Sequence, residues 1–403
     1  MNKASNVQAH TYHPWLVYVV FSAVIVMIAS FDIFLPNLSI MRDYFKTNEI
    51  TMQFSIILTP FISAFTGLIY GQLSDQRGRK PIFLLSLILL VVGSIVCAGS
   101  THLSVFLLGR FIQALSAGGI MNVSLAILAD IYKGPAYARY ISIFGLLYPV
   151  VFAFSPNIGA VLGAYFSWRS GFILIAFLSL ICFFFIRLYV EETLKNPQES
   201  ASAWSIIPKV VHYLKPSPFL SLTIIHSLPV ALSPIFTTNA AFLFIDVYGY
   251  TPATYAQLQL IPLFFSMLGA LVYRKVILQI GFALSFKIGT SIMALFIILT
   301  ILLCVFYHIN TAVGLALMSL LNFSVAFIVS TAATQAFEHF TTDKGVGIAF
   351  VAMIRNLIIS LSGMTVSLFY NHTSAPIFLG CAIICIAVII LYWMQKKHSS
   401  AQN

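Results

Sequence analysis

The amino-acid sequence predicts an all-α membrane protein with twelve transmembrane helices in two six-helix halves. The 403-residue chain is 60% hydrophobic and only 8% charged, with a mean hydropathy of +0.97, whereas a soluble domain carries about 25% charged residues. Apolar runs long enough to cross about 30 Å of hydrocarbon recur along the chain. Basic residues gather in alternate connecting loops, which is the charge pattern of a multi-pass membrane protein.

The apolar runs are expected to be helices, because backbone groups in lipid need internal partners and the runs lack the period-2 alternation of barrel strands. They cover residues 15–40, 52–74, 81–99, 103–131, 140–164, 167–189, 218–245, 253–275, 281–306, 309–335, 345–369 and 374–394. A long polar segment with several prolines separates the sixth run from the seventh. The predicted organisation is an N-terminal six-helix bundle (1–190), a cytoplasmic linker (191–217) and a C-terminal six-helix bundle (218–403).

The net charge of +10 is not concentrated on one face, because basic residues such as Arg77, Arg79 and Lys80 fall in alternate loops. The positive-inside rule makes these loops cytoplasmic and places both chain termini there. A nucleic-acid partner is therefore not expected. The expected partners are a small-molecule substrate, protons and the lipid bilayer, and the expected state is a monomer.

The sequence contains no motif for chemistry other than transport. The five cysteines lie within apolar runs and have no metal-ligand spacing. Neither a Walker-type phosphate loop nor an H-E-x-x-H motif is present. We therefore expect no metal, no cofactor and no enzymatic activity, and we expect an energy source other than ATP.

The turn from Gly71 to Pro81 reads G-Q-L-S-D-Q-R-G-R-K-P. It resembles the signature loop between helices 2 and 3 of the major facilitator superfamily. The resemblance implies a conformational latch between the two halves that is broken and remade during transport. In this latch Asp75 would face the positive end of another helix, and Arg79 would pair with an acid such as Asp130. Gly71 and Gly78 would allow close approach and the tight turn. The alternative interpretation is a solvated basic loop.

Two polar residues deep in the first half are candidates for proton coupling. Arg110 begins an R-x-x-Q pattern that ends at Gln113 and resembles the family's helix 4 signature. It lies about 12 Å inside the outer end, a depth that costs several kcal/mol unless the charge is paired or hydrated. Asp32 begins a D-x-x-L-P element that resembles helix 1 of proton-coupled drug antiporters of the bicyclomycin-resistance (Bcr/CflA) type.

Desolvation favours the protonated form of Asp32, whereas Arg110 favours its charged form. We therefore expect Asp32 to carry the proton and Arg110 to modulate it. The alternative is a static ion pair between them.

The fifth apolar run contains Ser155-Pro156-Asn157-Ile-Gly159, which resembles the G-P-x-x-G-G signature of antiporters. Proline bends a helix, and small residues let helices approach closely. Generic small-residue packing is the alternative. Glu192-Thr-Leu194 after the sixth run adds to the resemblance.

A second group of buried polar and aromatic residues is expected to line a central substrate cavity. A lone buried histidine is more often a packing residue, and aromatic residues more often pack or face lipid, so these alternatives stay open. Arg355 is harder to explain as packing because its burial is costly. The predicted cavity residues are Gln113, Phe152, His226, Phe236, Asn239, Arg355 and Asn356.

These patterns predict a proton-coupled secondary transporter that works by alternating access and exports drugs or small amphipathic metabolites across a bacterial inner membrane. One acid against two arginines in the cavity favours neutral or anionic substrates, so a dedicated metabolite or siderophore transporter, exporting or importing, is the alternative. A membrane receptor without transport activity is a further alternative, disfavoured because no soluble domain is attached.

Overall fold

The computed structural model describes residues 15–194, 207–306, 309–338 and 344–402, and every regular element within these ranges is helical. The first half contains α1 (Trp15–Asp32), the 3-10 turn η1 (Leu35–Asn37), α2 (Leu38–Phe45), α3 (Glu49–Arg77), α4 (Arg79–Gly99), α5 (Leu103–Ile131), α6 (Gly134–Tyr165) and α7 (Arg169–Tyr189). The rest contains α8 (Ile207–Tyr213), α9 (Pro218–Val230), α10 (Leu232–Phe242), the π-helical turn η3 (Leu243–Val247), α11 (Pro252–Leu258), α12 (Leu260–Phe306), α13 (Thr311–Glu338), α14 (Lys344–Leu368) and α15 (Ala375–Gln402).

The described residues form eleven helical segments that are long and apolar enough to cross a membrane, where the sequence predicts twelve. The difference lies in one segment of 55 residues, Pro252–Phe306. At about 1.5 Å per residue it would measure roughly 80 Å, more than twice the thickness of the hydrocarbon core. Gly281 interrupts α12 with φ 68° and ψ 175°, which is not helical. The segment therefore contains the predicted eighth and ninth crossings, joined by a turn at Gly281.

Two crossings predicted as continuous are broken. The first divides into α1, η1 and α2, with Pro36 inside η1. The seventh divides at Ala231 and continues as α10 and η3. Pro229 and Pro234 flank that break. Proline removes a backbone donor and clashes with the preceding turn, so both breaks follow from the sequence.

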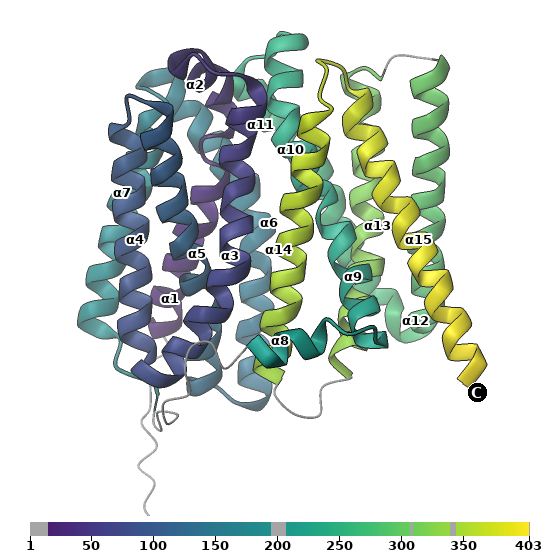
Figure 1. The fold of residues 1–403 in the computed structure, drawn as a ribbon, viewed down its shortest axis with the longest axis horizontal. Coiled ribbons are helices and arrows are strands. Elements are labelled where there is room, and N and C mark those ends of the chain that lie inside the picture. The colour runs from purple at the N-terminus through teal and green to yellow at the C-terminus, as the bar shows by residue number, and fades with distance from the viewer. Residues whose placement is uncertain (1–14, 195–206, 307–308, 339–343, 403) are drawn as a thin grey trace, which may run out of the picture.

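Helices α1–α7 lie on one side of the bundle and α9–α15 on the other, while α8 runs across the lower end (Figure 1). Helices α3 and α14 run side by side along the seam, where Ala64 and Leu68 of α3 share an apolar cluster with Val351 and Met353 of α14. The upper end in Figure 1 is called the α2 end and the lower end the α8 end. Residues 195–206 of the predicted linker lie outside the described residues, and the predicted domain boundaries stay predictions.

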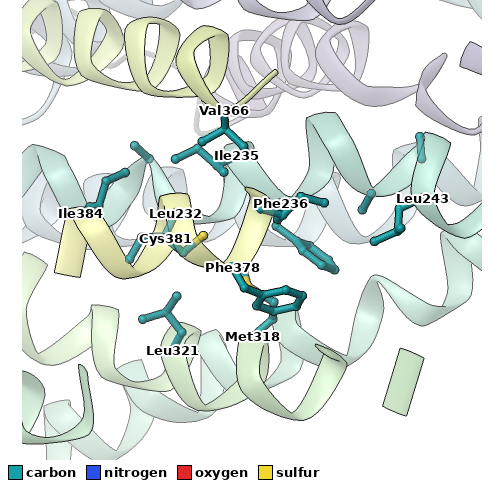
Figure 2. Packing of buried hydrophobic residues seen from close by; sticks show 14 of the residues in the cluster. Leu232, Ile235, Phe236, Leu243, Met318, Leu321, Val366, Phe378, Cys381 and Ile384 are labelled. Atoms are coloured by element: carbon teal, nitrogen blue, oxygen red, sulfur yellow. The ribbon is translucent and has the colours of Figure 1, made fainter. Parts of the chain in front are cut away.

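The second half has a close-packed apolar core. Figure 2 shows Phe236 of α10 beside Phe378 of α15, with Met318 and Leu321 of α13 below them. Phe236 is almost completely buried there and contacts the rings of Phe244 and Phe378. The prediction that Phe236 lines a substrate cavity is therefore wrong for this conformation, because the residue faces the core of its own half.

Candidate functional site

Asp32 is the last residue of α1 and lies at the break in the first crossing. The chain leaves the helix with the Ile33 amide bonded to the Ala29 carbonyl. The Asp32 side chain is half-buried and makes no hydrogen bond or ion pair with any residue in the described ranges. The C-terminal end of a helix carries partial negative charge, which disfavours a carboxylate. Asp32 is therefore an unpaired acid within the membrane part of the bundle, in a position that favours proton uptake.

Arg110 on α5 is completely buried and is satisfied by neutral acceptors. Its guanidinium donates to the backbone carbonyls of Ser30 (3.0 Å) and Ser55 (3.2 Å). It also donates to Thr59 Oγ1 at 2.9 Å and to Gln113 Oε1 at 2.7 Å. These bonds join α5 to the end of α1 and to α3. Because the Ser30 carbonyl belongs to the last turn of α1, Arg110 stabilises the broken end of that helix.

The static ion pair between Arg110 and Asp32 is not formed, so that alternative is wrong for this conformation. The guanidinium instead lies 4.5 Å from the centre of the Phe34 ring, in cation–π geometry. It remains an electrostatic neighbour of Asp32. Arg110 thus places a positive charge near Asp32 without forming an ion pair with it.

Gln113 is predicted to line the cavity, but the structure places it inside the first half. Its side chain is buried, accepts from Arg110 and donates to Ser94 Oγ at 2.7 Å. That prediction is therefore wrong for this conformation, because Gln113 positions Arg110 and is not exposed to a cavity.

The fifth-crossing motif on α6 packs directly on the break in α1. A Cβ atom on Gly159 would lie 1.6 Å from the Ile33 carbonyl oxygen, so only glycine fits. Asn37 Nδ2 donates to the Gly159 carbonyl at 3.0 Å. Asn157 Nδ2 donates to the Ala153 carbonyl at 2.9 Å and contacts the Ala256 carbonyl of the other half at 3.4 Å. Together with Pro156 inside the helix, this motif connects the Asp32 segment to the second half.

The predicted latch contains the expected ion pair between Arg79 and Asp130, but both ion pairs of Arg79 lie within the first half and do not join it to the second. Arg79 pairs with Asp75, and its Nε lies 3.0 Å from Asp130 Oδ2. Arg79 also donates to Ser74 Oγ at 2.7 Å. Gly71 does not provide close approach here, because no atom lies within 4 Å of a Cβ placed on it. That part of the expectation is wrong for this conformation.

Glu192 is a latch residue whose contacts could not be predicted. Its carboxylate accepts from the backbone amides of Arg79 (2.8 Å) and Lys80 (3.1 Å), at the start of α4. Gly78 has φ 103°, and a Cβ there would lie 2.3 Å from Glu192 Oε2. Thr193 Oγ1 donates to Asp130 at 3.2 Å. The segment after α7 therefore caps α4 and holds the turn, and its only sequence signal was the Glu192-Thr-Leu194 resemblance.

Arg355 on α14 is half-buried and makes no hydrogen bond or ion pair with a residue that the structure describes. Its electrostatic neighbours are Tyr148 of α6 and His226 of α9. Phe152 is half-buried and packs on Tyr148, with 5.6 Å between ring centres. The ring nitrogen Nδ1 of His226 lies 3.1 Å from the Val329 carbonyl of α13. His226 thus makes the packing contact described by the alternative interpretation, while Arg355 keeps an unpaired charge near both halves.

Asn239 and Asn356 bond across the seam between the halves. Asn239 Oδ1 accepts from Gln53 Nε2 at 3.0 Å, and both side chains are completely buried. Asn356 Nδ2 donates to Ser63 Oγ of α3 at 3.2 Å. In this conformation they hold the halves together, and Asn239 is not open to a cavity. A groove of about 660 Å³ between α12 and α13 has an apolar lining and includes none of the predicted site residues.

The chain is similar in sequence to known membrane proteins over most of its length. The model of the Major Facilitator Superfamily matches residues 20–363. The multidrug resistance protein MdtL of Citrobacter koseri is 27% identical over 387 residues, covering 92% of this chain and 94% of that protein. MdtL of Salmonella typhi is 27% identical over 408 residues, covering 95% and 96%.

Solved structures show the same fold. A POT family transporter in complex with a thioalcohol-conjugated peptide has a TM-score of 0.74 at 14% identity, over 95% of this chain and 97% of that one. The human organic anion transporter MFSD10 has a TM-score of 0.67 at 16% identity, over 93% and 98%.

Proposed function

Because the chain belongs to the Major Facilitator Superfamily, we propose that it is a proton-coupled secondary transporter that exports drugs or small amphipathic molecules by alternating access. Relatives that match nearly the whole chain are named multidrug resistance proteins, which supports drug export and does not favour the dedicated metabolite or siderophore transporter. The membrane is proposed to be a bacterial inner membrane, with the protein acting as a monomer.

The observation that carries the proposal is the unpaired carboxylate of Asp32 at the broken end of α1. The C-terminal end of α1 places partial negative charge beside Asp32, and the guanidinium of Arg110 places positive charge near it. Such opposed influences let proton occupancy respond to small changes in the surroundings. Broken helices near the membrane centre are where many transporters bind coupling ions and substrates.

The contacts made by the broken end of α1 could couple proton binding at Asp32 to movement of the two halves. The Ile33 carbonyl packs against Gly159, and Asn157 on the same helix reaches Ala256 in the second half. A change in the charge of Asp32 would shift this segment and alter the contact between the halves. The latch formed by Arg79 and Asp75 would control the rate at which the protein changes between its two conformations.

We propose that Arg355 contacts the substrate. A guanidinium that is half-buried within the membrane part of the bundle and has no partner is costly, and a carbonyl or carboxylate oxygen of a substrate would supply the missing acceptor. Tyr148 and Phe152 would provide an apolar surface beside it. This arrangement supports neutral or anionic amphipathic substrates.

The orientation follows from charge. The C-terminal end of α15 and the turn between α3 and α4, which carries Arg77, Arg79 and Lys80, both lie at the α8 end, on opposite sides of the bundle (Figure 1). By the positive-inside rule the α8 end would face the cytoplasm and the α2 end the outside.

Proton flux measured with a transported compound tests the proposed function. A growth screen across toxic compounds, with and without the gene, first identifies a compound that is exported. Purified protein in liposomes with an imposed pH gradient should then dissipate that gradient when the compound is added, and an uncoupler should abolish accumulation. Export at the same rate without a proton gradient would contradict the proposal.

A further inference from the structure

A network of ion pairs joins the two halves at the α2 end. Arg42 of α2 lies 2.6 Å from Asp246 of η3, which belongs to the second half. Arg42 also lies 3.1 Å from Glu49 at the start of α3. His372, in the turn between α14 and α15, has Nδ1 3.5 Å from Glu49 Oε1. The first half therefore supplies the base Arg42 and the acid Glu49, and the second half supplies the acid Asp246 and the base His372.

Three of the four side chains are more enclosed than ordinary surface ion pairs, while the fourth, His372, is 66% exposed. The side chains of Arg42, Glu49 and Asp246 are 21%, 12% and 23% exposed. The Arg42 guanidinium lies 5.7 Å from the centre of the Phe242 ring. Tyr370 packs beside His372, and burial together with the charges of Glu49 and Asp246 raises the pKa of its phenol, so the ring stays neutral. Partial burial weakens screening and makes these pairs more effective than exposed ones.

The turns that deliver these side chains have strained backbones. Lys46, directly after α2, has φ 51°, and His372 has φ 63°. Within the described ranges these are the two residues other than glycine with positive φ. Such conformations cost about 1–3 kcal/mol and persist only where surrounding contacts hold them. The Lys46 turn is closed by backbone bonds from the Lys46 and Thr47 amides to the Asp43 and Arg42 carbonyls, while His372 itself takes part in the contact with Glu49.

A buried polar contact lies behind the network. Gln53, one turn along α3 from Glu49, donates to Asn239 of α10 at 3.0 Å, and neither side chain is exposed. Because α3 begins at Glu49, Gln53 and its partner Asn239 lie about one helical turn further from the α2 end than the ion pair of Glu49. The burial of Asn239 therefore reports whether this end is closed.

We propose that Arg42, Asp246, Glu49 and His372 form the gate that closes the α2 end, and that breaking their pairs opens the interior to that side. The inference goes beyond the proposed function because it concerns the state of the halves and needs neither a substrate nor a proton gradient.

Alkylation of a cysteine at position 239 tests the gate. The reporter is Asn239→Cys in the purified full chain in lipid nanodiscs, and the probe is a water-soluble maleimide. Alkylation of the native cysteines is measured in protein that lacks the reporter, and this background is subtracted. Arg42→Ala, Asp246→Asn and the double variant are compared with the reporter alone. The control is Asp43→Asn, because Asp43 also bonds Arg42 at 2.8 Å but lies on the same helix α2.

Each single gate variant should raise the alkylation rate about three- to tenfold, as loss of a partly buried pair implies. The double variant should be no faster than the faster single one, because both changes remove the same bond. Asp43→Asn should stay within about twofold of the reporter alone.

The proposal would be overturned if both single variants had the same alkylation rate as the reporter alone. It would also be overturned if the rate increases of the two single variants multiplied in the double variant. If a variant at Arg42 fails to fold, His372→Ala replaces it and should raise the alkylation rate by a smaller factor. An alkylation rate in His372→Ala equal to that of the reporter alone would also count against the proposal.

Discussion

The Gly159→Ala substitution tests whether the broken end of α1 is held by direct contact with α6. The added Cβ would lie 1.6 Å from the Ile33 carbonyl oxygen and 2.7 Å from its carbon. To regain even 3.0 Å, the carbonyl and Cβ must separate by about 1.4 Å (3.0 − 1.6), and the obstacle is backbone that cannot rotate away. Overpacking of this kind costs about 1–3 kcal/mol.

We expect Gly159→Ala to lower the thermal unfolding midpoint by several degrees. We also expect proton-coupled transport to fall about tenfold or more, because a 1 Å misplacement of a reacting group is enough to cost that much. Asp32 directly precedes Ile33, so the carboxylate would move with the obstructed carbonyl. The assays are thermal unfolding of purified protein and transport in liposomes with an imposed pH gradient.

Gly71→Ala is the matched control, since it is the same substitution in another glycine of a predicted motif. No atom lies within 4 Å of the Cβ that it adds, and alanine is favoured over glycine inside a helix by about 0.5–1 kcal/mol. The control should unfold at the same temperature or slightly higher. If Gly159→Ala matched Gly71→Ala in both assays, the close contact between α6 and the break would be refuted.

Substitutions at three other places in the structure test separate parts of the mechanism. Arg110→Lys should reduce transport at least tenfold, because a lysine cannot reproduce the fork that bonds two backbone carbonyls and two side chains; a wild-type rate measured in liposomes would count against this role. Asp75→Asn and Arg79→Ala should slow transport with little change in the equilibrium dissociation constant of substrate, and an equal loss of affinity would argue against a latch. Arg355→Ala should weaken binding of an anionic substrate more than of a neutral one, with partial recovery in Arg355→Lys; unchanged affinity for both, measured on purified protein, would make Arg355 structural.

Much of the fold could be predicted because hydrocarbon imposes a simple rule on helix length and backbone bonding. The breaks beside Pro36 and Pro229 are also explained by residues visible in the sequence. The predicted eighth run ends at residue 275, whereas the helix continues as far as Gly281. The boundary was missed because the turn that joins the eighth and ninth crossings is short and apolar. Apolar residues alone do not mark where a helix leaves the membrane.

The partners of the deep charges could be predicted only in part. The depth of Arg110 follows from counting residues, but two of its acceptors are the backbone carbonyls of Ser30 and Ser55. Backbone carbonyls occur at every position, so no pattern marks the ones that are used. The Arg79–Asp130 pair was predictable from a motif, whereas no pattern in the sequence pairs Arg42 with Asp246, which lies 204 positions away.

Several predicted cavity residues proved to be buried because a residue type does not specify its direction. Phe236 and Gln113 lie on helices that line the interior, yet each faces the core of its own half. Arg355 carried a stronger signal, since an embedded charge must meet either a partner or the site. The structure leaves it unpaired among the described residues.

Uphill transport by Asp32→Asn tests the central claim that this carboxylate carries the coupled proton. The variant keeps the size of the side chain and removes its titration, and Asp43→Asn is the control because its side chain is 68% exposed on the same half. The measurement is accumulation of an exported compound against its gradient in liposomes with an imposed pH gradient. We predict that Asp32→Asn still folds and lets the compound equilibrate down its gradient but accumulates none, whereas the control behaves like wild type. Accumulation by Asp32→Asn at the wild-type rate would contradict the account.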